Sequence, residues 1–367
     1  MEKQNKVLEN IINKSELTRE DLKYLLLLKE PSDLATLFTK AYNIKAALIG
    51  RKVNFRGLIE YSNSCSKDCL YCGIRCSNKS KQIYELSEKE VLEAVNYAIE
   101  ARFGSVVLQS GEISNRPHTR KITHLIKEIK QLSHNKLGIT LSLGEQSEET
   151  YREWFEAGAH RYLLRIEVSN PKLYGRLHPN NKNHDYQLRL DCLKLIKKIG
   201  YQVGTGIMIG LPFQTIDDLV DDLFFIKDFD VDMVGMGPYI EHPSTPLYEY
   251  RHLLIPKKER FGLAVKMVAV LRILMKDINI ASTTALQALD KQGREKGLMA
   301  GANIVMPNIT PVFYREGYKL YEGKPGTDET PQQSLKKLEH QINKAGDTIA
   351  YDEWGDSHHF ENRMLGK

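Results

Sequence analysis

The sequence predicts an α/β protein built on a (β/α)8 barrel of the TIM type, with helices before it and an extension after it. The first observation is that, from Val53 onward, short apolar runs alternate with segments whose apolar residues recur at helical spacing. The second is their number. Eight runs are expected to form strands: residues 53–60, 105–109, 138–142, 161–166, 203–209, 231–236, 278–282 and 303–306. An open doubly wound sheet is the alternative, and the number of strands favours the barrel.

Glycines supply the third observation. Several predicted helices end at a glycine just before the next strand, namely at Gly104, Gly158 and Gly200. Glycine readily adopts the left-handed backbone conformation that ends a helix, so these glycines mark the expected helix ends before the barrel strands.

Three segments are expected. Residues 1–50 form helices outside the barrel, with Thr18 as an N-cap. Residues 51–310 form the barrel itself. Residues 311–367 form a C-terminal extension that packs at the barrel bottom, and its Gly-, Pro-, Lys- and Gln-rich part over 322–345 reads as an exposed connection and a helix.

Composition limits the function classes. Of the 367 residues, 41% are hydrophobic and 27% are charged, which is ordinary for a globular protein. The net charge of +5 is mild and the lysines are dispersed, so a solvated surface is favoured over a nucleic-acid footprint. The first residues lack an apolar signal region and no apolar run reaches membrane-spanning length, so we expect a cytoplasmic protein with no membrane partner.

Four of the five cysteines fall within residues 65–76, which in a large cytoplasmic enzyme indicates metal ligation rather than disulfides. Cys65, Cys69 and Cys72 have C-x3-C-x2-C spacing and follow the first predicted strand, where a barrel places its active-site loop. Three thiolates can hold three irons of a four-iron four-sulfur cluster and leave the fourth iron free. S-adenosylmethionine (SAM) can chelate that iron through its amino and carboxylate groups. One electron then breaks the sulfonium bond and yields methionine and a 5′-deoxyadenosyl radical.

A structural zinc site is the alternative, because Cys76 would supply a fourth thiolate. Zinc sites more often separate their two ligand pairs widely, and a zinc knuckle at a barrel mouth is uncommon. The catalytic cluster is therefore the favoured interpretation, with Cys76 as a spare or peripheral thiol.

Polar residues at other predicted strand ends could hold SAM. Ser110, Gly111 and Glu112 follow the second strand, where a glycine permits close approach and carbonyl groups can accept from an ammonium group. Arg165 and Glu167 lie two residues apart on one face after the fourth strand. Facing the barrel interior, they must either pair with each other or bind a polar ligand: a glutamate can hold ribose hydroxyls, and an arginine a carboxylate.

Arg189 begins a helical stretch, and Met208 lies at the end of the fifth predicted strand. Taken alone, each has an ordinary structural explanation, as a surface residue and a core residue respectively.

Taken together, these residues carry a resemblance that spans nearly the whole chain. Its motifs are EYSNSCSKDCLYCG, VLQSGE, TLSLGE, YLLRIE, GLPFQTIDDLVDDL, DMVGMGP and ANIVMPNITP. They resemble the HydE family of FeFe-hydrogenase maturases, in the biotin-synthase-like branch of the radical SAM superfamily. The resemblance implies the complete barrel, and an adenosyl radical acting on a small iron–carbonyl–cyanide–cysteine complex during assembly of the hydrogenase H-cluster. An electron donor such as ferredoxin or flavodoxin is implied as a partner.

The resemblance also assigns roles. It implies that the three cysteines are the catalytic cluster ligands, and that further residues contact SAM: Ser110, Gly111, Glu112, Arg165, Glu167, Arg189, Met208 and, near the cavity bottom or entrance, Tyr314. Four hydroxyl residues are implied to line the substrate end: Thr140, Ser142, Thr283 and Thr284. The three threonines have an equally good explanation as β-branched strand residues.

The chain departs from the family at three places. No cysteine follows Tyr321-Glu322-Gly323-Lys324, so a single cluster is expected. Ile166 stands where the family commonly has histidine, and Ile113–Arg116 replaces an aromatic stretch. These departures keep open a paralogue acting on another small molecule, for example an amino-acid mutase of the methylornithine synthase type. A non-catalytic metal-binding module is a third hypothesis, which the SAM-contact residues disfavour.

Overall fold

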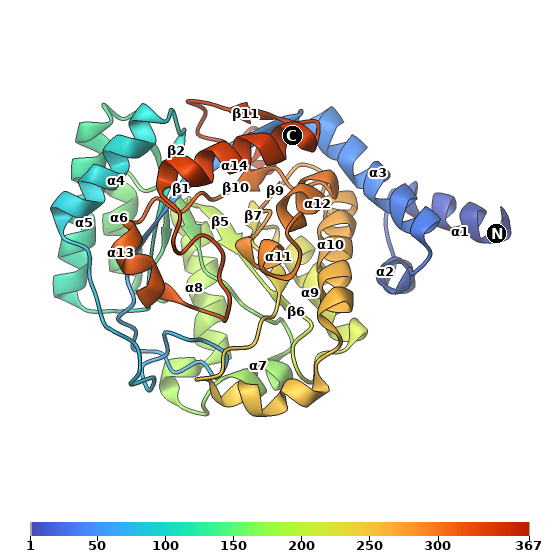
Figure 1. Ribbon diagram of the computed structural model, residues 1–367, viewed down its shortest axis with the longest axis horizontal. Helices are drawn as coiled ribbons and strands as arrows, with labels where there is room; N and C mark the ends of the chain where they lie inside the picture. Colours follow the sequence, from blue (N-terminus) through green and yellow to red (C-terminus); the bar gives the residue numbers. More distant parts are fainter. Residues whose placement is uncertain (1, 367) are drawn as a thin grey trace.

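The computed structural model describes residues 2–366, and within them a ring of parallel strands forms the core (Figure 1). The order is β10-β1-β2-β3-β4-β5-β7-β9, with every neighbouring pair parallel. The ends of this path, β9 and β10, also meet: the amide of Asn303 donates to the carbonyl of Ile280, and that of Ser282 to Ile304, each at 2.9 Å. This closes the ring and confirms the predicted barrel.

The strands of the barrel lie where the sequence predicts them. Their bounds are β1 Lys52–Ser62, β2 Ser105–Ser110, β3 Gly138–Ser142, β4 Arg161–Leu163, β5 Gln202–Thr205, β7 Met233–Val234, β9 Asn279–Ile280 and β10 Ile304–Val305. A further strand, β11 (Thr348–Ala350), pairs with the beginning of β1 and has no counterpart in the prediction.

The fifth and sixth predicted strands are interrupted. Residues 203–209 divide into β5 and β6 (Met208–Ile209), and β6 pairs with β8 (Gly237–Pro238) in a separate two-stranded ladder. The side chain of Arg165 fills the gap, because its guanidinium donates to the carbonyls of Ile207 and Gly235. These two carbonyl groups therefore bond to a side chain in place of a neighbouring strand, and the sheet is interrupted there.

Helices surround the ring (Figure 1). Those of the barrel are α4 Glu88–Glu100, α5 Arg116–Leu132, α6 Glu148–Glu156, α7 Pro171–Leu177, α8 Tyr186–Ile199, α9 Ile216–Phe229, α10 Lys257–Leu274, α11 Thr284–Leu289 and α12 Gly293–Met299, with 3-10 turns η1 Lys182–His184 and η2 Pro246–Leu253. Side chains from the helices and the outer strand faces form one continuous apolar core. A smaller core lies near the cysteine loop.

The predicted helix ends need one revision. Gly200 caps α8 at φ +111, and Gly158 follows α6 at φ +117, both left-handed as expected. Gly104 is different, because the left-handed residue after α4 is Arg102. A Cβ on Gly104 would lie 1.6 Å from the carbonyl oxygen of Glu353, so this glycine permits close approach of the C-terminal segment.

The N-terminal helices are α1 (Glu2–Ile12), α2 (Arg19–Leu27) and α3 (Pro31–Leu48), and they extend to one side of the barrel (Figure 1). Thr18 caps α2 as predicted, its hydroxyl accepting from the amide of Asp21. Helix α3 packs on α10, where Lys45 and Asp347 form an ion pair with both side chains fully buried.

The C-terminal extension contains α13 (Val312–Arg315), η3 (Glu316–Tyr318), α14 (Pro331–Lys344), β11 and α15 (His358–Met364). Its first part lies on the cysteine side, where Lys324 pairs with the buried Glu60 of β1. Its last part lies at the opposite end, where Arg161 of β4 contacts Asp356 at 2.6 Å. The extension therefore reaches both ends of the barrel, while the division at 310 stays a prediction.

Ion pairs hold helix α15 against the end of the barrel that lies opposite the cysteine loop. The imidazole of His359 lies 2.5 Å from Asp230 and 2.9 Å from Asp277, and Arg363 contacts Asp232 at 2.8 Å. The hydrogen bond to Asp277 and that to Asp230 raise the pKa of His359 above its ordinary value.

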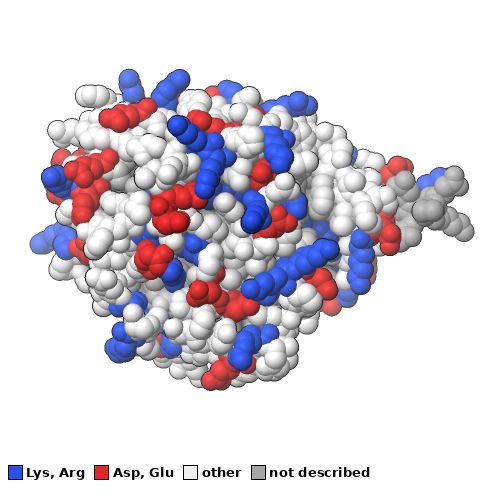
Figure 2. Space-filling model, viewed as in Figure 1, with Lys and Arg blue, Asp and Glu red and all other residues white. Residues whose placement is uncertain are grey.

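Basic and acidic side chains are interspersed over the face shown in Figure 2, which fits the dispersed lysines of the sequence. None of the helices within residues 2–366 is long and apolar enough to cross a membrane.

Candidate active site

The cysteine loop leaves the carboxyl end of β1 and is tied to three neighbours. The amide of Ser66 donates to Glu112 after β2, that of Leu70 to Leu177 at the end of α7, and that of Gly73 to Leu320 of the extension, at 2.9 to 3.0 Å. These bonds satisfy backbone groups that an irregular loop would otherwise leave unpaired. The loop is therefore held in one conformation by the parts of the fold that also carry the predicted SAM contacts.

The thiols of Cys65, Cys69 and Cys72 are half-buried and influence one another. Burial, followed by the neighbouring Cys65, raises the pKa of Cys72 to about 12, and burial and Cys72 raise that of Cys69. Because each thiolate raises the pKa of its neighbours, the three thiols are suited to a bound cationic centre that displaces their protons.

Local donors prepare the loop for thiolates. Burial, followed by Glu112, raises the pKa of Cys65. The amides of Lys67 at 3.4 Å and Glu112 at 3.3 Å donate to its sulfur and, like the charge of Lys81, act in the opposite direction. This donor set fits an iron–sulfur cluster. Cys76 is exposed, and no group of His, Cys, Asp and Glu side chains in residues 2–366 is gathered closely enough to hold a single metal ion.

The turn after β2 touches the cysteine loop directly. A Cβ on Gly111 would lie 2.2 Å from the carbonyl oxygen of Ser64 and 2.7 Å from the Cβ of Cys65, so only glycine allows this contact. Ser110 turns its hydroxyl to the carbonyl of Gly111 at 2.7 Å. The sequence placed this turn beside the cysteines, and the two segments do lie in contact.

Glu112 belongs to a cluster of four charges, which we call the charge quartet: Lys67, Glu112, Glu145 and Arg189. Arg189 lies 2.8 Å from Glu112 and 2.9 Å from Glu145, and Lys67 lies 2.6 Å from Glu145. Although burial acts to raise the pKa of Glu112, Arg189 and then Lys67 hold it below its ordinary value. The quartet is electrically balanced, and it connects the cysteine loop to β2, β3 and α8.

Arg165 and Glu167 pair with each other, as one of the two alternatives expected. The guanidinium donates to both carboxylate oxygens, at 2.8 and 2.9 Å. Glu167 adopts φ +66, a left-handed conformation that is costly for a residue with a side chain and is typical of functional sites. The side chain of Arg165 is 31% exposed, so the pair still presents polar groups to open space.

A glycine allows the side chain of Arg165 to pack closely against the backbone. A Cβ on Gly206 would lie 2.4 Å from Nη1 of Arg165 and 2.2 Å from the carbonyl of Gly235. Met208 is half-buried and packs against the small apolar core that also contacts Leu70 and Tyr71 of the cysteine loop. An apolar wall beside an Arg–Glu pair fits the adenosyl and methionyl parts of SAM, so the residues present fit this cofactor.

The four predicted substrate residues lie in different surroundings. Thr140 is fully buried and accepts from Nε of Arg161 at 3.0 Å, deep in the barrel. Ser142, at the end of β3, is half-buried. Thr283 donates to the carbonyl of Met236 at 3.1 Å, and Thr284 accepts from Arg294 at 3.4 Å. Their role toward a substrate stays a prediction.

Tyr314 stands apart from the other predicted SAM contacts. It packs on Tyr84 with ring centroids 5.0 Å apart, and its hydroxyl donates to Glu90 at 2.6 Å. Tyr318, four residues later, is 1% exposed and its hydroxyl accepts from Gln109 of β2 at 3.3 Å. Tyr318 is thus the residue of this segment that the fold buries beside β2, although the sequence singled out Tyr314.

Sequence reasoning missed several residues that shape the site. Glu145 and Lys67 complete the charge quartet, and His184 holds the cysteine loop because its Nε2 accepts from the amide of Asp68 at 2.9 Å. Lys81 binds the carbonyls of Ile74 and Arg75. Two of these residues had a sequence signal: Lys67 lies between two cysteines of the motif, and Glu145 ends the motif TLSLGE.

Comparison with known proteins agrees with this geometry. Residues 59–226 match the model of the radical SAM superfamily. The FeFe-hydrogenase maturase subunit HydE of Thermotoga maritima is 45% identical over 315 residues, 85% of this chain and 86% of that protein. Biotin synthase of Endomicrobium trichonymphae is 28% identical over 309 residues, 83% and 90% of the two chains. The solved structure of methylornithine synthase superposes with a TM-score of 0.78 and 24% identity, covering 94% of this chain and 97% of that one, and shows the same fold.

The barrel, the cysteine loop and these matches define a radical SAM enzyme, which uses a four-iron four-sulfur cluster and SAM. Within that class, the chain belongs to the family of the FeFe-hydrogenase maturase HydE. Both expectations from the sequence motifs are confirmed.

Proposed function

We propose that Cys65, Cys69 and Cys72 hold the cluster and that SAM lies between the Ser110–Glu112 turn, the Arg165–Glu167 pair, Arg189 and Met208. When bound, the cluster supplies the electron that cleaves SAM to methionine and the 5′-deoxyadenosyl radical. The observation that carries this proposal is the contact of Glu112 with both the cysteine loop and Arg189.

The residues of the chain have distinct tasks in this arrangement. The amides of Lys67 and Glu112 stabilise the charge on Cys65, and Arg189 offers a guanidinium beside the loop for the SAM carboxylate. Glu167 offers its carboxylate to ribose hydroxyls while Arg165 fixes its orientation. Met208 and its apolar neighbours exclude water from the adenine side.

The test uses protein reconstituted anaerobically with iron and sulfide, then given dithionite and SAM. Release of 5′-deoxyadenosine by the wild-type chain is expected, with no release from Cys72→Ala. If the protein carries a full cluster and releases no 5′-deoxyadenosine, the proposed SAM site is wrong.

We propose further that the radical serves hydrogenase maturation, with an iron–carbonyl–cyanide–cysteine complex as the substrate. The 45% identity to HydE over most of both chains supports this role over that of a more distant paralogue. Apo-hydrogenase mixed with the other maturases should become active only when this chain is added. Failure, combined with turnover of a free amino acid, would favour a mutase of the methylornithine synthase type.

The electron donor is proposed to be an acidic one-electron carrier such as flavodoxin or ferredoxin, docking at a groove beside the cysteine loop. Gly73, directly after Cys72, lines this groove together with Lys81, and Ile83 and Phe313 on its wall are 67% and 81% exposed. Exposed apolar residues with neighbouring lysines suit a transient acidic partner.

Visible bleaching of the cluster measures this reduction directly. Ile83→Ser with Phe313→Ser should slow reduction by flavodoxin and leave reduction by dithionite unchanged. Equal rates for wild type and variant with flavodoxin would place the docking surface elsewhere. A cytoplasmic location is also proposed, because four of the five cysteines fall within residues 65–76, a cluster typical of metal ligation in a reducing compartment.

A further inference from the structure

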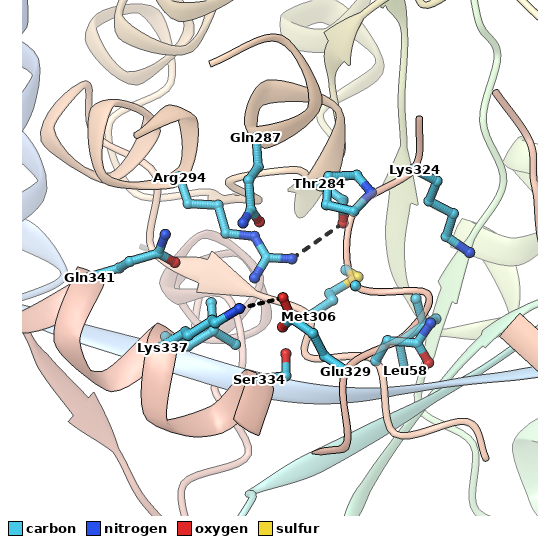
Figure 3. Close-up of a pocket in the computed structure, with 14 residues that line it drawn as sticks. Leu58, Thr284, Gln287, Arg294, Met306, Lys324, Glu329, Ser334, Lys337 and Gln341 are labelled. Atoms are coloured by element: carbon cyan, nitrogen blue, oxygen red, sulfur yellow. Dashed lines mark hydrogen bonds and ion pairs between the residues drawn. The ribbon is translucent and has the colours of Figure 1, made fainter. Parts of the chain in front are cut away.

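A second pocket lies outside the SAM contacts, between the barrel and the C-terminal extension (Figure 3). The space inside it that a water-sized group can occupy is about 30 Å³, and the pocket is partly open to solvent. The wall combines Leu58 of β1, Met306 and Asn308 after β10, the start of α11 and α12, and α14. Leu58 lies within β1, whereas Met306, Asn308 and Thr284 follow the carboxyl ends of β10 and β9, the end of the barrel from which the cysteine loop also leaves.

Arg294 of α12 projects into this pocket, with its guanidinium between Thr284 and Met306 in Figure 3. The residue is 8% exposed. Within the described residues its guanidinium makes one hydrogen bond, from Nη2 to the hydroxyl of Thr284 at 3.4 Å, and its buried Nε has no acceptor. No carboxylate of the described residues lies within 4.0 Å of it.

Other buried arginines of the barrel are satisfied differently. Arg272 donates to three carbonyls and to the side chain of Asn303, at 2.8 to 3.1 Å. Arg315 donates to four carbonyls at 2.6 to 3.0 Å. Four further buried arginines, namely Arg56, Arg161, Arg189 and Arg260, also have one guanidinium nitrogen without a hydrogen-bond acceptor, but each donates at least two side-chain hydrogen bonds. Arg294 differs from all of these because its guanidinium donates a single, long bond.

The acid that lines the pocket does not fill this role. Glu329 lines the same pocket, but its carboxylate lies 2.5 Å from Nζ of Lys337 (Figure 3). Burial lowers the pKa of Arg294 only to about 10, so the group keeps its positive charge at neutral pH. A buried charge with no partner is costly, and a counter-ion from solution removes that cost.

We propose that this pocket binds a small monoanion of the carboxylate class, held by the guanidinium of Arg294. The planar fork of an arginine matches the two oxygens of a carboxylate. The hydroxyl of Thr284 and the side-chain amides of Gln287 and Gln341 line the same space and can donate to the ligand. Three cationic side chains line the pocket: Lys337 pairs with Glu329, Lys324 pairs with Glu60, and Arg294 is the one with no carboxylate within 4.0 Å among the described residues.

Binding here requires neither SAM nor a reduced cluster, so the inference is independent of the proposed function. The carboxylate can come from free small anions or from a substrate that reaches the barrel mouth, because Thr284 lies both at the pocket and among the predicted substrate residues. Experiments on the full-length reconstituted protein without SAM test the free anion. Repeating them with SAM and a candidate substrate tests whether the substrate displaces it.

The first experiment locates the anion. Crystals soaked in sodium bromide should show an anomalous peak within hydrogen-bond distance of the Arg294 guanidinium, and sodium acetate should abolish it by competition. Absence of a peak at Arg294, with bromide bound at other sites, would overturn the proposal.

The second experiment measures thermal unfolding as acetate rises at constant ionic strength maintained with a bulky sulfonate buffer. The wild-type melting temperature should rise and saturate, as for any ligand of the native state. Arg294→Gln should weaken acetate binding about tenfold or more, since the charge-assisted bonds are lost. Without acetate it should melt no lower than the wild type, because an unpaired charge has been removed.

Lys337→Gln is the matched control, because it removes a charge from the same pocket but keeps Arg294. It should retain the saturable response to acetate. If Arg294→Gln does not fold, Arg294→Lys replaces it, with weakened but measurable binding expected. Two outcomes would show that Arg294 has a purely structural role. In the first, the melting temperature of Arg294→Gln still rises and saturates with acetate. In the second, Arg294→Gln is destabilised and the melting temperature of the wild type does not change with acetate.

Discussion

Lys67→Met tests whether the charge quartet holds the cysteine loop in place. Nζ of Lys67 lies 2.6 Å from Glu145, with side chains 9% and 7% exposed. At an effective dielectric constant near 20, their direct attraction is about 6 kcal/mol, most of which desolvation offsets. Removing one partner of a buried pair costs about 3–5 kcal/mol. Because Arg189 still faces Glu145, we expect Lys67→Met to lower the free energy of unfolding by about 3 kcal/mol, the lower end of that range.

The double variant Lys67→Met/Glu145→Gln distinguishes charge balance from loss of packing. The single change leaves the quartet with a net negative charge, whereas the double change restores neutrality. We therefore expect the double variant to be more stable than the sum of the single effects predicts, by about 2 kcal/mol. Lys89→Met, which breaks an exposed pair with Glu93, is the control and should change stability by less than about 0.5 kcal/mol.

Chemical denaturation under anaerobic conditions measures these free energies, and the iron content per chain reports on the loop. Lys67 lies between two of the proposed ligands, so its single variant should also bind less iron than the double variant. Single and double effects that add to within about 0.5 kcal/mol would refute the coupling. Unchanged iron content in Lys67→Met would show that the quartet does not support the loop.

Three further outcomes are expected. His359→Gln should lower the melting temperature most at pH values below the pKa of histidine in the unfolded chain, because the pKa of His359 is raised in the folded chain. The difference from the wild type should vanish as the pH rises through the folded-state pKa. A difference that does not change with pH would contradict the ion pairs of His359 with Asp230 and Asp277. Gly111→Ala should disturb the contact with the cysteine loop and weaken SAM binding measured by equilibrium dialysis, whereas Gly262→Ala, with open space around its Cβ, should stabilise α10 by about 0.5–1 kcal/mol. Cys72→Ala should lose the cluster absorbance and Cys76→Ala should keep it; the reverse would exchange their roles.

The barrel and the position of its active-site loop were predictable from the sequence because both depend on local patterns. Alternating apolar runs set the strands, and parallel strands bring their carboxyl ends to one side. For that reason the Ser110–Glu112 turn could be placed near the cysteines, and the two do touch through Gly111 and Ser64. The motifs also sufficed for the family.

The sequence did not reveal which side chains form ion pairs and hydrogen bonds with one another, because these partners meet only in the folded chain. Glu145 ends the motif TLSLGE after β3, but the motif does not reveal its partners, and only the closed ring brings it to Lys67 and Arg189. The break between β5 and β6 comes from the Arg165 side chain, which belongs to another strand. Strand pattern alone could not foresee it.

The sequence by itself determined the barrel, the cluster motif and the enzyme family, since these follow from periodicity and spacing within short segments. The tertiary structure decided which charges meet, that Tyr318 rather than Tyr314 is buried beside β2, and that Arg294 is left without a partner. Hydrogen bonds and ion pairs act over a few ångströms between residues distant in sequence. Their pairing exists only after the ring of strands has closed.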